Sequence, residues 1–301
     1  MNFRKHHRCL FSAVSSLTLI LGAAAEESAI DKLKADADKG DANALFQLGK
    51  TYDGGAGVSQ DHTKGAEFYR KAAELGNFKA QHNLGSMYLE GRGVNKDEAE
   101  AMKWFRKAAE QGAVLSQNAL GLMLRKGLAR NDREAGEWFR KAAEQNFAEA
   151  QFHLGELYYR GGVGVEADYD QAALWLGKAV AQGNMPAQNV LGLLYEQGLG
   201  VEKNAEKAAD LFRTAAEQGD ANAQENLGRL YSIGVGVKRD FARAWLWMTL
   251  GGQRGNMFSE KRCQELEWLM TPEQLAEGKR LLKESKLQKT NAPALPPSAS
   301  E

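Results

Sequence analysis

The dipeptide Leu-Gly recurs along this chain of 301 residues at a nearly constant interval. Its glycines are separated by 36, 36, 34, 37 and 36 residues in turn. The six copies are Leu48-Gly49, Leu84-Gly85, Leu120-Gly121, Leu154-Gly155, Leu191-Gly192 and Leu227-Gly228. A fixed period in this range is typical of stacked repeats, in which each repeat buries its apolar face against its neighbours. The spacing therefore predicts one elongated repeat array.

Each repeat has the pattern of two helices joined by a glycine-rich loop. In the first copy Asp41 is a suitable N-cap residue, and small, apolar and aromatic residues follow at intervals of four as far as Tyr52. The glycines of segment 54–57 predict the end of that helix, and a second helix is expected from about Lys64 to Gly76. The pattern predicts an all-α fold in which each repeat is helix, glycine loop, helix.

The glycine of each Leu-Gly dipeptide lies in the middle of a predicted helix, where glycine costs about 1 kcal/mol relative to alanine. We expect a close contact between helices to compensate for this cost. Two columns of large residues on the second helices are expected to form the core. They are Phe68, Trp104, Trp138, Trp175, Leu211 and Trp247, and beside them Tyr69, Phe105, Phe139, Leu176, Phe212 and Met248. The residues Gly76, Gly112, Asn146, Gly183 and Gly219 are expected to end these helices in the left-handed conformation.

The chain begins with the pattern of a signal peptide. Three basic residues precede an apolar run at 10–21, and three alanines at 23–25 suit cleavage after Ala25. The apolar run is short for a membrane span, which needs roughly 20 residues, although an uncleaved anchor is an alternative. The predicted organisation is a signal peptide at 1–25, a capping helix at 26–40, six repeats at 41–255, C-terminal capping helices at 256–287 and a disordered tail at 288–301.

The charge pattern argues against nucleic acid as a partner. The chain has 39 basic and 39 acidic residues, and signal cleavage would remove three basic ones, leaving 36 against 39 and a net charge of −3. Charges of both signs alternate, whereas neutralising phosphates requires clustered Lys and Arg. We expect a periplasmic or secreted protein with no membrane span after cleavage.

The residues that could carry chemistry do not form a recognisable constellation. Cys263 would be the only thiol left after cleavage, since Cys9 lies in the signal, and we expect it to be buried. His62, His82 and His153 do not have the spacing of a metal site. No serine after residue 25 has Lys three positions later, so a Ser-x-x-Lys nucleophile is missing. The sequence predicts no catalytic residue, no metal and no cofactor.

Two positions on the first helix of each repeat vary in chemistry from copy to copy, and they lie four residues apart on one face. One column is Phe46, His82, Asn118, Phe152, Asn189 and Glu225, and the other is Lys50, Ser86, Leu122, Glu156, Leu193 and Arg229. We predict that they line a concave groove that binds a protein or peptide, with the phenylalanines and leucines as apolar anchors. The alternative is that the two phenylalanines only fill space between repeats.

The pattern resembles the Sel-one-like repeat family, which is related to the tetratricopeptide repeat. The family motif is most complete at Ala221-Asn222-Ala223-Gln224, Leu227-Gly228, Tyr231, Gly234, Gly236 and Val237, and its second half at Ala101, Trp104, Lys107, Ala108, Ala109 and Gly112. The third repeat departs from it, because Leu124 replaces the aromatic residue and the second loop glycine is missing. The resemblance implies a right-handed α-solenoid of antiparallel helix pairs that serves as an adaptor in bacterial envelopes, host contact or signalling.

The resemblance leaves three functions open. The first is a secreted or periplasmic protein-binding scaffold that is not an enzyme. The second is an envelope hydrolase or β-lactam-binding enzyme, because the cysteine-rich branch of the family is associated with β-lactam binding; that branch staples its repeats with disulfides, which this chain lacks. The third is a permanent structural subunit of an envelope complex. The missing nucleophile favours the scaffold.

Overall fold

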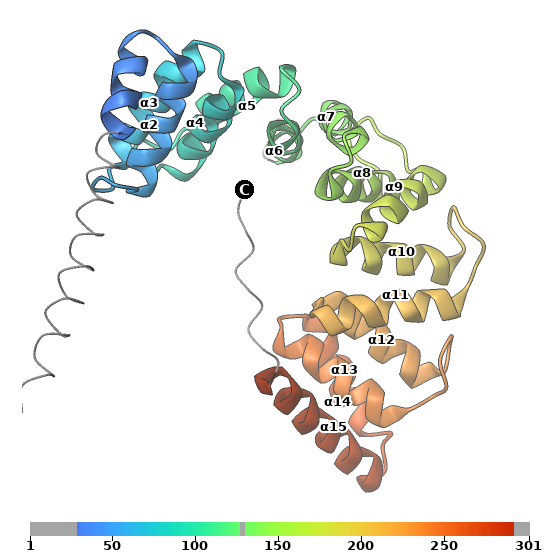
Figure 1. The fold of residues 1–301 in the computed structure, drawn as a ribbon. Helices are drawn as coiled ribbons and strands as arrows, with labels where there is room; N and C mark the ends of the chain where they lie inside the picture. Colours follow the sequence, from blue (N-terminus) through green and yellow to red (C-terminus); the bar gives the residue numbers. More distant parts are fainter. Residues whose placement is uncertain (1–28, 127–129, 292–301) are drawn as a thin grey trace, which may run out of the picture. The chain divides into compact units, whose positions relative to one another are not determined.

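The computed structural model describes residues 29–126 and 130–291, and these fold into successive α-helices (Figure 1). A short helix at 29–38 comes first. The repeats follow as α2 (Ala42–Gly54) with α3 (His62–Glu74), α4 (Phe78–Glu90) with α5 (Glu98–Glu110), α6 (Val114–Leu124) with α7 (Asp132–Glu144), α8 (Ala148–Arg160) with α9 (Tyr169–Ala181), α10 (Met185–Gln197) with α11 (Ala205–Gln218), and α12 (Ala221–Ile233) with α13 (Phe241–Gln253). Two further helices, α14 (Met257–Glu267) and α15 (Pro272–Asn291), complete the described chain.

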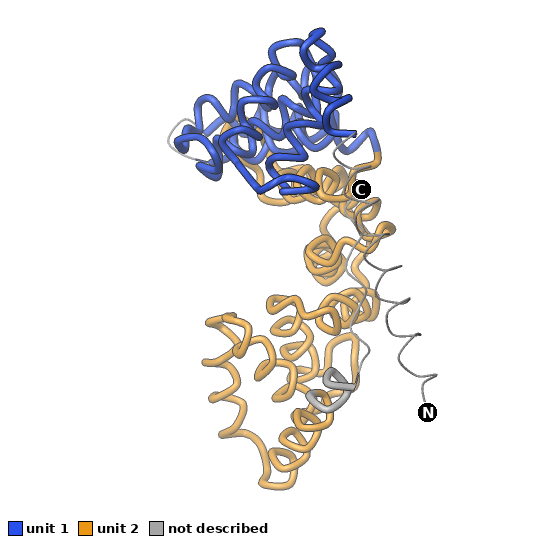
Figure 2. The backbone as a smooth tube through the Cα atoms, turned by 60° about the vertical axis from the view of Figure 1, so that its left-hand side comes forward, with its two compact units in different colours: residues 1–145 blue, residues 146–301 orange. Residues whose placement is uncertain are grey.

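The chain divides into two compact units (Figure 2). The first unit comprises residues 1–145 and holds α2 to α7, and the second comprises residues 146–301 and holds α8 to α15. Within each unit the two helices of a repeat pack against each other, and the second helix packs against the first helix of the next repeat. The predicted all-α solenoid of antiparallel helix pairs is confirmed.

The Leu-Gly glycines allow the two helices of a repeat to approach closely. A Cβ atom placed on Gly192 would lie 2.6 Å from Cε1 of Phe212, and one placed on Gly155 would lie 2.7 Å from Cγ of Leu176. Gly121 has the same relation to the buried ring of Phe139. The expected close contact is confirmed, since the large residue of the second helix occupies the space that a side chain would need.

The column that contains the tryptophans is only partly in the core, since Phe68, Leu211 and Trp247 are half-buried. Trp104, Trp138 and Trp175 are buried, and a lysine three residues later covers each ring. The ammonium of Lys141 lies 3.9 Å from the ring centroid of Trp138, well within the range of a cation–π contact. The lysine of the repeat motif is therefore explained by the ring that it covers, and these tryptophans are not available for a ligand.

The glycines of the loops and caps adopt backbone conformations that residues with a side chain rarely adopt. Gly76 and Asn146 have φ values of 89° and 65°, so the predicted left-handed ends of the second helices are confirmed. Gly93 and Gly200 also have positive φ, and a side chain on either would overlap a backbone carbonyl of the preceding repeat. These Gly-x-Gly loops are turns packed between repeats, as the helices before them indicated.

The C-terminal helices differ in one respect from the prediction. Residues 288–291, assigned to a disordered tail, continue α15 to Asn291. Nothing before Pro293 prevents a helix from continuing, and the residue before a proline disfavours helical geometry, so the helix ends there. The remainder of the predicted tail and the predicted signal peptide lie outside the described residues. No helix in the described part of the chain is both long and apolar enough to cross a membrane.

Candidate protein-binding face

A ladder of glutamines ties neighbouring repeats together within each unit. The side-chain amide of Gln81 in α4 donates to the carbonyl of Ala73 in the preceding repeat at 3.0 Å. Its own side-chain carbonyl accepts from Gln111, at the end of the second helix of the same repeat, at 2.7 Å. The same link between glutamines recurs as Gln145 to Gln117, Gln182 to Gln151, and Gln218 to Gln188. The glutamine of the repeat motif therefore satisfies buried backbone and side-chain groups and is a structural residue.

Replacing Gln81 with leucine should destabilise the first unit. The Ala73 carbonyl would keep only its hydrogen bond from the Gly76 N–H, and the Gln111 amide only its bond to the Lys107 carbonyl. Two hydrogen bonds are therefore lost, each worth about 0.5–1.5 kcal/mol. Urea unfolding followed by circular dichroism measures the change. Gln47→Leu on the exposed side of α2 is the matched control and should shift the free energy of unfolding by less than about 0.5 kcal/mol. Equal effects of the two substitutions would contradict the ladder's role.

The two variable columns share one face of the first helices, which we call the column face. In the first unit its most apolar member, Phe46, is buried against Tyr69, with ring centroids 5.9 Å apart. Lys50 is exposed and lies over the Phe46 ring. Ser86, Asn118 and Leu122 are half-buried. Phe46 therefore packs against the second helix of its own repeat and offers little surface to a partner.

His82 belongs to the column face and forms the Ser–His hydrogen bond of this unit. Its Nδ1 lies 2.9 Å from Oγ of Ser116 in the next repeat. Burial lowers the pKa of His82, so the ring is neutral near pH 7. Ser116 is fully buried at the position of the small column, so no substrate could reach its hydroxyl. The contact joins two repeats and does not constitute a nucleophile with its base.

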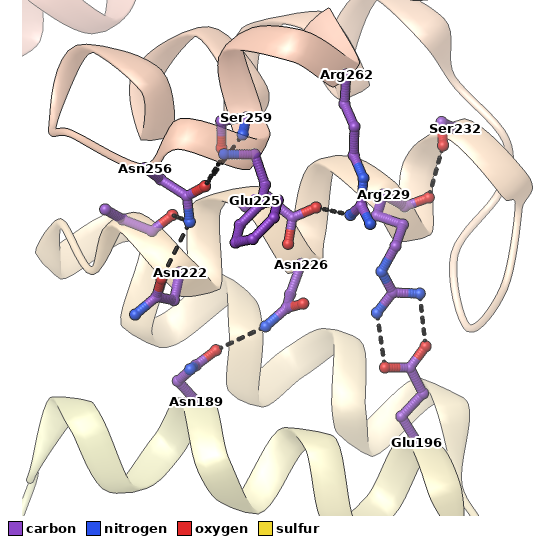
Figure 3. Close-up of polar contacts among 12 residues, drawn as sticks. Asn189, Glu196, Asn222, Glu225, Asn226, Arg229, Ser232, Asn256, Ser259 and Arg262 are labelled. Atoms are coloured by element: carbon purple, nitrogen blue, oxygen red, sulfur yellow. Dashed lines mark hydrogen bonds and ion pairs between the residues drawn. The ribbon is translucent and has the colours of Figure 1, made fainter.

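In the second unit the column face is a ladder of polar contacts between successive first helices (Figure 3). Asn226 of α12 donates to the side-chain carbonyl of Asn189 of α10 at 2.9 Å. The guanidinium of Arg229 makes two hydrogen bonds, of 2.8 and 2.7 Å, to the carboxylate of Glu196. Glu225 is buried and pairs with Arg262 of α14. Three of the predicted site residues are thus linked to residues that the sequence analysis did not select.

The remaining predicted residues of the second unit are half-buried. Phe152 and Leu193 pack against the apolar core, and Glu156 pairs with Arg160 at 3.1 Å. Because their side chains support the packing of repeats, Phe152 and Leu193 offer only part of their surface to a partner. Arg229 and Glu196 are half-buried as well, and Asn189 is buried.

The groups with potential chemistry elsewhere are structural. The thiol of Cys263 is buried, as expected, and lies 3.3 Å from the hydroxyl of Thr249; burial raises the pKa of the thiol, so it is protonated at neutral pH. Among residues 29–126 and 130–291, no three His, Cys, Asp or Glu side chains come together as a metal ion would require.

The repeats match the family described as Sel1 repeat. The matched segments are residues 42–77, 78–112, 114–147, 148–184, 186–220 and 221–256. These cover more than half of the chain, with boundaries that follow the helix pairs of the structure. The chain belongs to the Sel1 repeat family, and the resemblance seen in the sequence is confirmed.

Two solved structures are similar over most of the chain. The protective antigen c5321 of uropathogenic Escherichia coli strains, which has an SLR fold, is 30% identical with a TM-score of 0.59, and the match covers 91% of this chain and 69% of that one. A Sel1 repeat protein from Oxalobacter formigenes is 29% identical with a TM-score of 0.55, and the match covers 81% of both chains. No curated protein matches the chain.

Proposed function

We propose that this protein is a scaffold that binds a polypeptide through the column face, acts in the periplasm or outside the cell, and has no catalytic activity of its own. The observation that carries the proposal is the contrast between columns. Core columns keep one residue class from repeat to repeat, whereas the column face changes from aromatic to amide to charged. Packing does not require the residue class to change from repeat to repeat. Recognition of a polypeptide that lies along several repeats does require it, because each repeat then contacts a different part of the partner.

Two further features support the proposal. The predicted signal peptide at 1–25 would direct the chain out of the cytoplasm. One of the similar structures is a protective antigen of uropathogenic Escherichia coli strains, which accords with an exported protein. A hydrolase is less well supported, because the Ser–His contact of the first unit involves a serine that a substrate could not reach.

Capture from envelope extract with the purified chain as bait tests this proposal. The double variant Glu196→Arg with Arg229→Glu keeps an ion pair between α10 and α12 but reverses its direction on the column face. We expect the affinity of this variant for the captured protein to fall at least about tenfold, which corresponds to about 1.4 kcal/mol. Its helical circular dichroism should be unchanged.

The matched control reverses an ion pair that joins second helices, Arg106 with Glu134, by the substitutions Arg106→Glu and Glu134→Arg. This variant should capture the same protein as the unaltered chain. Loss of capture in the control, or full capture by the Glu196/Arg229 variant, would show that the column face is not the binding surface. A partner that stays bound through high-salt washing would favour a permanent structural subunit.

A further inference from the structure

Helix α14 is the first helix of an incomplete seventh repeat. Its N-cap residue Asn256 donates to the side chain of Asn222 at 3.0 Å, just as Asn77 donates to Asn43 at 2.9 Å in the first unit. Ser259 is fully buried at the position that alanine holds in the repeat before. In the complete repeats the second helix packs against the first helix of the same repeat, whereas α15 packs mainly against α13 rather than against α14. The seventh repeat therefore lacks its second helix.

One side of the segment 257–269, which comprises α14 and the turn after it, is exposed. Four large apolar side chains lie there, with exposed fractions of 85% for Met257, 74% for Phe258, 90% for Trp268 and 69% for Leu269. Successive helical residues are about 100° apart, so these positions fall within an arc of about 120°. The buried residues Ser259, Cys263 and Leu266 lie on the opposite side of the helix. Exposed apolar groups gathered in this way mark an interaction surface rather than isolated surface residues.

The arrangement of this face is complementary to itself. Its apolar residues form two pairs, one at each end of α14, and Lys261 and Glu265 lie between them. If two copies of α14 cross antiparallel about a two-fold axis near residue 263, Phe258 meets Trp268 of the second copy. Lys261 then meets Glu265 of the second copy, and the reverse contact repeats by symmetry. A parallel arrangement would oppose like charges.

The available area is in the range that a dimer needs. An aromatic side chain contributes roughly 150–250 Å² when it is covered, and each copy offers two such rings together with Met257 and Leu269. Two copies together therefore reach the low end of the roughly 1,200–2,000 Å² that stable interfaces bury.

We propose that the exposed face of α14 is a homodimer interface, in which the α14 helices of two copies pair antiparallel. The proposal does not require that the column face of the six repeats bind a partner. Its occupant is a second copy of this chain, because both the apolar ends and the central charges of the face find their complements in the face itself.

Sedimentation velocity over a concentration series, on the chain expressed with its own N-terminal segment, tests this interface. The unaltered protein should sediment as a dimer at tens of micromolar and dissociate on dilution. Trp268→Asp should raise the dimer dissociation constant at least about tenfold. Leu174→Asp is the matched control, because Leu174 is a half-exposed leucine on α9 of the same unit, and it should leave the dimer intact. A monomer at all concentrations for the unaltered chain, or equal weakening by both substitutions, would overturn the proposal.

A charge exchange tests the antiparallel arrangement itself. Lys261→Glu alone opposes Glu265 of the second copy with a carboxylate at both symmetric contacts, and Glu265→Lys alone opposes two ammonium groups, so each should weaken the dimer. The double variant restores opposite charges and should dimerise as the unaltered chain does. Circular dichroism should be the same for all variants, because both side chains are exposed. A double variant as weak as the single ones would exclude the antiparallel register.

Discussion

Replacement of Phe212 by alanine is expected to lower the free energy of unfolding of the second unit by about 3–5 kcal/mol, the usual cost of removing a buried aromatic ring. The ring is fully buried in the core cluster that joins α11, α12 and α13. Urea unfolding measures the loss. The same substitution at Phe78, a partly exposed residue of α4, is the control and should cost much less. A similar small loss at both positions would show that the column of Phe212 is not the core of the repeats.

The location of this loss is also predicted. Because each repeat contacts only its neighbours, Phe212→Ala should speed hydrogen exchange in α10 to α13 more than in the helices of the first unit. Hydrogen-exchange mass spectrometry resolves these segments. A uniform increase along the whole chain would mean that the two units unfold together.

Replacement of Gly192 by alanine should destabilise the protein by about 1–3 kcal/mol, the usual cost of overpacking a core. Alanine is the better helix former by about 1 kcal/mol, so helix propensity alone predicts the opposite sign. The contact decides the outcome, since the new Cβ atom would lie 2.6 Å from Cε1 of Phe212. Gly177→Ala in α9 is the matched control; nothing lies within 4 Å of its added Cβ, and it should stabilise the chain.

Combining the two substitutions isolates the contact. In the Phe212→Ala background the ring is gone, so Gly192→Ala should become neutral or stabilising, and the two effects should not add. Additive effects in urea unfolding would mean that the cost at Gly192 arises elsewhere. The result would also apply to Gly121, which has the same relation to Phe139.

The helix pairs were predictable because the physical requirements of packing repeat with the sequence. Each Leu-Gly dipeptide lies where the two helices of a repeat are in contact, and a glycine or asparagine lies at each left-handed helix end. The period of these residues in the sequence was therefore enough to locate the core. Even the third repeat follows the rule, since Leu124 is buried where other copies have tyrosine. The loop at 127–129, where this repeat lacks the second loop glycine, lies outside the described residues.

The column face was only partly predictable. Its positions follow from the helical period, but which side chains remain available depends on neighbours from other helices. Phe46 is covered by Tyr69, and Glu225 is paired with Arg262 of a helix that the sequence pattern treated as a cap. The repeat character of α14 was hidden because Ser259 and Cys263 replace the usual alanine and leucine. The capping asparagine Asn256 was the available signal.

Hydrogen-exchange mass spectrometry of the chain with and without its captured protein is the most direct test of the scaffold function. Binding at the column face should protect backbone amides of α10 and α12, which contribute Asn189, Glu196 and Arg229, more than those of α9 and α11. Protection confined to α9 and α11, or no protection of first helices in either unit, would contradict the proposal that the variable columns bind the partner.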